Sequence, residues 1–562
     1  FCLSLVKIFF LRFMVLCKLW DRPVSIVQSN CSEAEQFSSH KRYHVAIITV
    51  TIKVYLRKPS KTLELILKHS LLAAFLFSAF SGQAAIAEQS EQLANYAVER
   101  YQQAQIHTLE NLVSYPTVNK EGLATPDNPD FIGFKSFLKM KAAQFGFDYQ
   151  DLGYTVLIGM GNQAEKVTIV THGDVQPADA SKWQQSPFKM DKTSEPGKLI
   201  ARGTEDDKGA IATALHAMKA IKDKGVTLNN RIELMVYLAE ESDWAPLKEF
   251  MKTYQQPKYA VTIDASYPVV VAEKGWSLIA PTFSATSAQT GLYVTDLKGG
   301  AFVSQIPEDA SVLVHNADAA TVAKLHDNVG KLKNVKVAIK EQEEGLLVQV
   351  KGTSAHSSEP ESGENAIAHL AEIFKGLDLE NNSDGQAIEF INQLIGLDLY
   401  GAQFGEIAYQ HDFMGPMTVS PTLLSRDGNE IKLSVNMRRP VGKQEDVLKQ
   451  QINNALTAWQ TRNNVTLKDT DIVIGTPMLL DSAPHAQALL DIFKHFTGDE
   501  DSGFVSIGGG TNAKLFDNAV SFGPSMPGKK YTGHSEHEFI TEQQLALNLK
   551  MYTAMMIKLG NM

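Results

Sequence analysis

Short apolar runs alternate with longer amphipathic stretches between residues 167 and 263, and this alternation constrains the fold more than any other feature. The runs are residues 167–171, 231–238 and 259–263, and the stretches between them are 209–224 and 245–254. The runs have the pattern of buried strands, and the stretches carry apolar residues at helical spacing. Strand–helix alternation of this kind predicts an α/β fold, in which a mostly parallel sheet has helices on both faces. Such sheets place their chemistry in loops just beyond the carboxyl ends of the strands.

The chain has 562 residues, which is too long for one hydrophobic core. After residue 275 the pattern changes to hairpin-like strands with turns such as 298–300 and 427–429, and the earlier pattern resumes near Pro477. We therefore predict an α+β lid domain, residues 276–474, inserted into a catalytic domain formed by residues 88–275 and 475–562.

Residues 1–87 have a different character. Residues 1–60 contain all three cysteines and no clear domain pattern, and we interpret them as a non-native or disordered upstream extension. Residues 61–87 have the features of a signal peptide: lysines, the apolar run 71–80, and the small-x-small sequence Ala85-Ile-Ala87. A membrane anchor is the alternative, but the apolar run is too short to span a bilayer. We expect cleavage before Glu88 and a periplasmic or secreted product, without stable membrane insertion and without cysteine.

The composition is that of a soluble globular protein, with 44% hydrophobic and 21% charged residues. The formal net charge is −10, and no basic run is interleaved with aromatic residues. Nucleic acid is therefore excluded as the main partner.

Acidic and histidine residues stand where the predicted strands end. His172 follows the first run, Glu240 and Glu241 follow the second, and Asp264 follows the third. Two more candidates are Asp206, at the start of a predicted helix, and His534, in a later loop. Each residue alone fits a commoner role, such as a turn, a helix cap or a solvated loop. Together they converge on one crevice, where so many carboxylates would repel each other unless a cation lay among them.

Charge bookkeeping favours two divalent ions. Asp206, Glu241 and Asp264 supply three negative charges, and a bridging hydroxide would supply a fourth. These charges balance two Zn²⁺ ions, with His172 and His534 as neutral imidazole ligands. Mixed nitrogen and oxygen ligation suits zinc, with Mn²⁺ and Co²⁺ as alternatives. Two ions about 3.5–4 Å apart would lower the pKa of the bridging water and polarise the scissile carbonyl.

Two acidic residues outside this ligand set are assigned supporting roles. A carboxylate must take the proton of the water and deliver it to the leaving amine, and Glu240, adjacent to a ligand, fits this role. Asp174 lies two residues from His172, on the same side of an extended chain. Its carboxylate can accept the other imidazole proton and fix the tautomer.

From about residue 90 to 562 the chain resembles the aminoacylase and dipeptidase family of co-catalytic di-zinc metallopeptidases, and most of all its bacterial Xaa-His, carnosinase-like dipeptidase branch. The matching segments are THGDVQP (171–177), RGTEDDKG (202–209), AEES (239–242), IDASYP (263–268), EKG (273–275) and SAHSSEP (354–360). The resemblance implies that His172 and Asp264 bind one ion, that Glu241 and His534 bind the other, and that Asp206 bridges them.

The resemblance also implies substrate contacts. His356, in the lid, would stabilise the oxyanion of the tetrahedral intermediate. Arg438, in an Asn436-x-Arg segment, would hold the terminal carboxylate of the substrate as a bidentate fork. Asn436, in the same segment, and Gly509, in the glycine-rich loop 508–510, would also contact the substrate.

The sequence departs from the family pattern at three positions. Ser304 stands where asparagine is expected, and Asn512 and Lys514 stand where an aromatic residue and arginine are expected. These departures leave the fine specificity open. His537 is a rival to His534, although the spacing to Glu538 favours His534.

These observations predict a metal-dependent dipeptidase that acts on small peptides with a free C-terminal carboxylate. An N-acyl amino acid deacylase or desuccinylase of the same family would share every metal ligand and is the alternative. A non-catalytic metal-binding homologue is a third reading, and the spare base Glu240 argues against it. Side-chain specificity, the native metal, and the choice between monomer and homodimer stay open.

Overall fold

The computed structural model describes residues 90–562. The predicted upstream extension (1–60) and the predicted signal peptide (61–87) lie outside the described residues. Residues 90–113 are helical. Among the described helices, none combines the length and the apolar character needed to cross a membrane.

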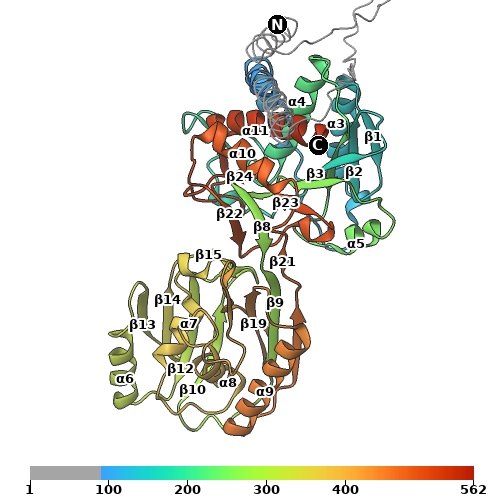
Figure 1. The fold of residues 1–562 in the computed structure, drawn as a ribbon. Helices are drawn as coiled ribbons and strands as arrows, with labels where there is room; N and C mark the ends of the chain where they lie inside the picture. Colours follow the sequence, from blue (N-terminus) through green and yellow to red (C-terminus); the bar gives the residue numbers. More distant parts are fainter. Residues whose placement is uncertain (1–89) are drawn as a thin grey trace, which may run out of the picture. The chain divides into compact units, whose positions relative to one another are not determined.

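A sheet of nine strands is built from residues that lie before and after the second sheet in the chain (Figure 1). Its strands are β1 (Asp148–Asp151), β2 (Thr155–Met160), β5 (Arg231–Tyr237), β3 (Lys166–His172), β6 (Tyr259–Thr262), β23 (Ala519–Ser521), β8 (Val269–Glu273) and β21 (Met478–Leu479) in spatial order, with β22 (Phe504–Ile507) also paired to β8. The four central strands, β5, β3, β6 and β23, are mutually parallel. The predicted α/β class is therefore confirmed, and β1, β2, β8 and β21, which lie on either side of this parallel centre, add antiparallel pairings.

Helices cover both faces of this sheet because the central strands are apolar on both faces. The helices of this part are α3 (Pro129–Phe145), α4 (Lys208–Asp223), α5 (Ala245–Met251), α10 (Ala486–Thr497) and α11 (Glu542–Asn561). Val167, Ile169 and Leu234 belong to the core that includes α3, α4 and α11. Val170 and Met235 belong to a second core with α5. The period of two along a strand divides these residues between the two faces.

Residues 275–474 form a second sheet, of eight strands, in which every pairing is antiparallel. The order is β13 (Lys336–Gln342), β14 (Gly345–Lys351), β12 (Asp309–His315), β10 (Tyr293–Gly299), β18 (Thr418–Asp427), β19 (Glu430–Arg439), β9 (Gly275–Phe283) and β20 (Asp469–Ile474). Its helices are α6 (Ala319–Val329), α7 (Ala366–Ile373), α8 (Ser383–Phe390) and α9 (Glu445–Asn463). We call residues 275–474 the lid region and the remaining described residues the catalytic region.

The chain passes between the two sheets at two places. Lys274 alone separates β8 from β9, and a short segment joins β20 to β21. A core of its own, which includes Phe283, Phe390 and Trp459, holds the lid region together.

Two small ladders position loops that carry candidate site residues. β4 (Lys198–Ile200) pairs with β25 (Phe539–Thr541), and β11 (Gln305–Ile306) pairs with β15 (Ala355–His356). In the second ladder Gln305 lies opposite His356. The first ladder brings the segments just before Arg202 and just after Glu538 together.

Candidate metal centre

The carboxyl ends of three neighbouring parallel strands carry most of the predicted ligands. His172 is the last residue of β3, Asp264 lies two residues beyond β6, and Glu240 and Glu241 follow β5. Asp206 precedes α4 by two residues. Because β5, β3 and β6 are adjacent and parallel, these ends meet at one edge of the sheet.

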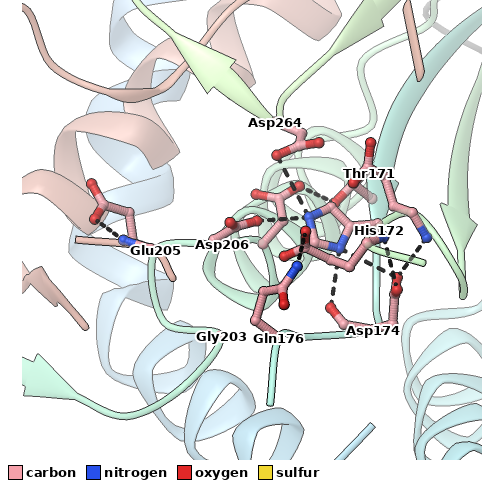
Figure 2. A network of polar contacts seen from close by, with 12 residues as sticks. Thr171, His172, Asp174, Gln176, Gly203, Glu205, Asp206 and Asp264 are labelled. Atoms are coloured by element: carbon pink, nitrogen blue, oxygen red, sulfur yellow. Dashed lines mark hydrogen bonds and ion pairs between the residues drawn. The ribbon is translucent and has the colours of Figure 1, made fainter. Parts of the chain in front are cut away.

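His172 is the centre of a first group of ligand atoms. Its Nε2 lies 2.7 Å from Asp206 Oδ1 and 3.5 Å from Asp264 Oδ1. Its Nδ1 faces the opposite way, 3.0 Å from the main-chain carbonyl oxygen of Asp174 and 3.4 Å from the Asp174 carboxylate. Figure 2 shows the ring between Asp206 and Asp264 on one side and Asp174 on the other. An acceptor at Nδ1 keeps the proton there, which leaves Nε2 with the lone pair that a metal ligand needs.

His534 is the centre of a second group. Its Nε2 lies 2.9 Å from Glu241 Oε1 and 3.1 Å from Asp206 Oδ2. Asp206 thus offers Oδ1 to the first group and Oδ2 to the second. The rival His537 is exposed and pairs with Glu195, so it does not join either group.

The donor set fits two divalent ions. In each group one ligand atom per residue can be chosen so that all lie within 4.8 Å of one another. Imidazole nitrogen and carboxylate oxygen are donors that zinc, manganese and cobalt accept. Burial raises the pKa of Asp264 to about 6, and the neighbouring carboxylates Asp206 and Glu241 add to the rise, while His172 acts in the opposite direction. Cations at this edge of the sheet would offset that repulsion.

Asp206 shows the opposite pKa shift. Burial acts to raise its pKa, but hydrogen bonds from His172 and His534 outweigh burial and hold the pKa well below its usual range. This carboxylate is therefore ionised in its buried position. An ionised carboxylate with both oxygens facing imidazole nitrogens has the geometry of a bridging ligand.

Glu240 stands apart from the ligand groups. Its carboxylate makes no hydrogen bond or ion pair with any other residue in the described part of the chain. Burial, together with the negative charge of Asp264, raises its pKa well above the usual range. Its main-chain N–H donates to Asp174 Oδ1 at 3.0 Å, and that of Glu241 donates to Asp174 Oδ2 at 3.0 Å. The Asp174 carboxylate therefore holds the main chain at Glu240 and Glu241, a role that the sequence analysis did not predict. The shorter of the two contacts between Asp174 and His172 comes from the Asp174 carbonyl oxygen.

Two further side chains reach the ligands. Gln176 Nε2 donates to Glu241 Oε2 at 3.0 Å. The Tyr531 hydroxyl donates to Asp206 Oδ2. Gln176 lies two residues beyond Asp174, and the period of an extended chain was the signal that could have found it. No local signal pointed to Tyr531, because its partner is more than 300 positions away.

His356, at the end of β15, lies near the second group, with its ring centroid 6.3 Å from that of His534. The main-chain N–H of Ser358 donates to His356 Nδ1 at 3.3 Å, and Ser358 Oγ lies 2.6 Å from the same nitrogen. Burial lowers the pKa of His356 to about 3, and the positive charges of Arg438 and His534 act in the same direction. His356 is therefore neutral near pH 7.

Arg438, near the end of β19, is 4% exposed. Its Nε donates to Asn436 Oδ1 at 3.2 Å, Nη2 donates to Ser357 Oγ at 3.0 Å, and Nη1 makes a long contact of 3.5 Å with the Gly508 carbonyl oxygen. These acceptors are all neutral. Within residues 90–562 no carboxylate lies within ion-pair distance of Arg438. Burial lowers its pKa to about 10, which still leaves it charged near neutral pH.

The glycine-rich loop 508–510 follows β22 and meets the lid region. A Cβ at Gly508 would lie 2.3 Å from the carbonyl oxygen of Ser358, so this close approach requires glycine. A Cβ at Gly509 would meet Ile507 alone, at 3.9 Å, and there is room beside this residue. The loop is therefore packed against the lid at Gly508 and open at Gly509.

The three departures from the family pattern have structural partners of their own. The Ser304 carbonyl accepts from the Ser357 N–H at 2.8 Å, so this residue supports the segment that holds Arg438. Lys514 Nζ donates to the Lys274 carbonyl at 2.7 Å, at the passage between the sheets. Asn512 is buried, and its Oδ1 has no hydrogen-bond partner among the described residues.

The α/β sheet carries histidine and carboxylate groups at its strand ends and is joined to an antiparallel lid, an arrangement suited to a metal-dependent hydrolase. Comparison of the sequence with protein families identifies the family: the profile of Peptidase family M20/M25/M40 matches residues 168–558. The chain therefore belongs to this family and is a peptidase, as the sequence analysis predicted. Peptidases of this family depend on metal ions.

A curated relative agrees with this assignment, and solved structures share the fold. The chain is 26% identical over 422 residues to a Beta-Ala-Xaa dipeptidase of Lactobacillus delbrueckii subsp. lactis, covering 75% of this chain and 86% of that protein. Its fold is similar to that of human carnosine dipeptidase 1, with a TM-score of 0.53 at 15% identity over 84% of this chain and 98% of the other. A dipeptidase of Saccharomyces cerevisiae gives a TM-score of 0.52 at 14% identity over 84% of this chain and 98% of its own.

Proposed function

We propose that the protein is a dipeptidase with two divalent ions, preferably Zn²⁺, that hydrolyses dipeptides carrying a free C-terminal carboxylate. One observation carries the proposal: Asp206 directs one carboxylate oxygen to the group of His172 and the other to the group of His534. Glu241 and Asp264 complete the two groups. The dipeptidase names of relatives that cover most of this chain support the same substrate class.

When bound, the ions would polarise the scissile carbonyl and lower the pKa of an attacking water. Glu240 takes the proton of that water and delivers it to the leaving amine. Its carboxylate has no hydrogen-bond partner among the described residues and its pKa is raised by burial, and both features suit a group that accepts a proton and later donates it. Asp174 holds Glu240 in place through the main chain.

His356 donates a hydrogen bond to the oxygen of the scissile carbonyl as negative charge develops there. A main-chain N–H can only donate, so the contact from Ser358 makes His356 Nδ1 an acceptor. In a neutral imidazole the proton then resides on Nε2, which becomes the donor that an oxyanion requires. The low pKa of His356 keeps this tautomer neutral across the physiological pH range.

Arg438 binds the free carboxylate of the substrate. A buried guanidinium whose acceptors are all neutral retains the capacity for a charged partner, and a carboxylate matches its planar fork. Asn436 fixes the orientation of the fork through Nε. Arg438 contacts the carbonyl oxygen of Gly508, and there is open space beside the next residue, Gly509. We assign substrate contact to Gly509 on that basis.

The proposal is tested with enzyme stripped of metal by a chelator and then reloaded with zinc, manganese or cobalt. Three substrate sets are compared: free dipeptides, the same dipeptides with an amidated C-terminus, and N-acyl amino acids. We expect turnover of free dipeptides to disappear on stripping and to return on reloading, with amidated peptides cleaved poorly. Equal cleavage of free and amidated dipeptides contradicts the carboxylate contact. Preferential cleavage of N-acyl amino acids makes the protein a deacylase.

A further inference from the structure

Two loops contact each other through glutamate side chains: the loop that carries Asp206 and the loop that carries His534. Each loop contributes one glutamate, which accepts hydrogen bonds from the other loop. Glu538 is fully buried, and each of its oxygens accepts two hydrogen bonds from the first loop. Oε1 accepts from the main-chain N–H groups of Glu205 at 2.9 Å and Asp206 at 3.0 Å. Oε2 accepts from the Gly203 N–H and from Arg202 Nη1, both at 2.9 Å.

Glu205 makes the reciprocal contact. Its Oε2 accepts from the Thr532 N–H at 2.6 Å, from the Thr532 hydroxyl at 2.5 Å and from the Gly533 N–H at 3.2 Å. Its Oε1 accepts from the Ser525 hydroxyl at 3.3 Å. Glu205 precedes Asp206 on the loop seen in Figure 2, and Gly533 precedes His534. Glu205 therefore fixes the main chain immediately before His534. Glu538 fixes the main chain at Asp206 and at the residue before it.

The second loop needs such support. His534 has a φ of 64°, in the left-handed region that side chains other than glycine adopt rarely. Such a conformation persists where the surroundings enforce it. His172 and Asp264, by contrast, adjoin β3 and β6, whose parallel pairing already sets their spacing.

We propose that Glu205 and Glu538 are positioning residues that set the distance between Asp206 and His534, and thereby the affinity for the second ion, the one held by Glu241 and His534. The inference rests on the two-ion site proposed above. Neither glutamate belongs to a ligand group, so each acts through the loops it holds. Loss of either set of contacts should displace His534 more than it displaces His172 or Asp264.

The hydrogen-bond patterns predict different tolerance to glutamine at the two positions. Both oxygens of Glu538 accept two donors, so the NH₂ group of Glu538→Gln must face two N–H donors with nothing to accept them. At Glu205 the main donors share Oε2, and Oε1 meets a hydroxyl that can accept as well as donate. Glu205→Gln therefore keeps most contacts, while Glu205→Ala removes all of them. Because both Glu205 variants lose the same negative charge, a difference between them does not come from charge.

The experiment measures zinc per chain in the full-length protein at increasing concentrations of a competing chelator. Activity is not the readout. We expect Glu538→Gln and Glu205→Ala to lose one zinc at a free-zinc concentration about 10–100-fold higher than the concentration at which wild type loses it. This is the usual effect of removing a residue that supports a metal ligand. The other zinc should be retained. Glu205→Gln should follow wild type. Glu536→Gln is the matched control, because Glu536 lies in the same segment but pairs with Lys182 at the surface.

Retention of both ions by Glu205→Ala at wild-type affinity would overturn the inference, as would release of both ions together. If Glu538→Gln does not fold, Glu205→Ala and Glu205→Gln still decide the question. A wild-type protein that binds no zinc or only one would refute the proposed two-ion site itself. The failure of the inference is thus distinct from the failure of the function on which it rests.

Discussion

The catalytic region and the lid region contribute opposite charges to the candidate site. At the strand ends of the catalytic region, Asp206, Glu240, Glu241 and Asp264 bring four carboxylates together with two histidines. The lid region contributes His356, which is neutral, and Arg438, a buried cation whose described acceptors are neutral. At the candidate site the catalytic region has an excess of negative charge, and the lid region has a positive charge with no carboxylate partner among residues 90–562.

This difference separates the tasks of the two regions. Under the proposed function, the carboxylates of the catalytic region would hold divalent cations, which would supply Lewis-acid chemistry at the scissile bond. The guanidinium of the lid region would hold the carboxylate at the C-terminus of a dipeptide. Variants of the catalytic region should therefore change metal content or kcat, whereas loss of Arg438 should change KM for substrates with a free carboxylate.

Asp206→Ala tests the metal side of the comparison and should have the largest effect. The substitution removes one ligand from each group, so we expect loss of both ions and of activity down to background. Metal analysis after gel filtration measures the ion content. Asp179→Ala is a control, because Asp179 caps a short surface helix. A fully loaded Asp206→Ala protein would contradict the bridging role.

Glu240→Gln should leave both ions in place and lower kcat by roughly 10²–10⁴-fold, the usual contribution of a general base. The amide keeps the size of the side chain, and the carboxylate has no described hydrogen-bond partner to lose. Kinetics on a free dipeptide, combined with metal analysis of the same sample, separate this role from ligation. Loss of metal from Glu240→Gln would place this residue among the ligands instead.

Arg438→Ala tests the lid side of the comparison. Hydrogen bonds to a charged group contribute about 1.5–3 kcal/mol, so KM for free dipeptides should rise by roughly 10–100-fold. The KM for amidated dipeptides should change little. Arg438→Lys keeps the charge but not the planar fork and should recover part of the loss. An equal rise of KM for free and amidated substrates would show that Arg438 acts on the lid structure rather than on the carboxylate.

The two regions also differ in how far the sequence predicts them. His172, Glu241 and Asp264 could be assigned because each follows an apolar run, and parallel strands align their carboxyl ends. The contacts of Glu538 could not be predicted, since its partner Asp206 is 332 positions away and nothing local indicates that two loops meet. The lid residues His356 and Arg438 were found by resemblance alone, because an antiparallel strand gives no rule for where its chemistry lies.

The edges of the nine-stranded sheet escaped prediction for a similar reason. The alternation of strands and helices in residues 167–263 predicts β3, β5 and β6 of the parallel centre. β1 and β2 lie before this stretch and β8 and β21 lie after it, so their antiparallel pairings are not part of the alternating pattern. The grouping of His172, Glu241 and Asp264 could be predicted because these residues follow strands of the parallel centre, where local pattern and tertiary arrangement coincide.

The smallest effect is expected at Ser358, which acts on the tautomer of His356. The Ser358 main-chain N–H and hydroxyl both lie at His356 Nδ1, at 3.3 Å and 2.6 Å. Ser358→Ala removes the closer donor and leaves the longer one, so the Nε2–H tautomer stays favoured but less firmly. Loss of one hydrogen bond of about 0.5–1.5 kcal/mol should lower kcat roughly 2–10-fold with little change in KM, because the contact from Nε2 strengthens only as charge develops on the substrate oxygen.

His356→Ala should lower kcat further, again with a modest change in KM. Ser358→Thr, which restores a hydroxyl, should recover most of the rate. Nitrogen-15 spectra of imidazole-labelled protein report the tautomer directly, and a rise of KM for free dipeptides without a fall in kcat would assign Ser358 to the carboxylate contact of the lid instead.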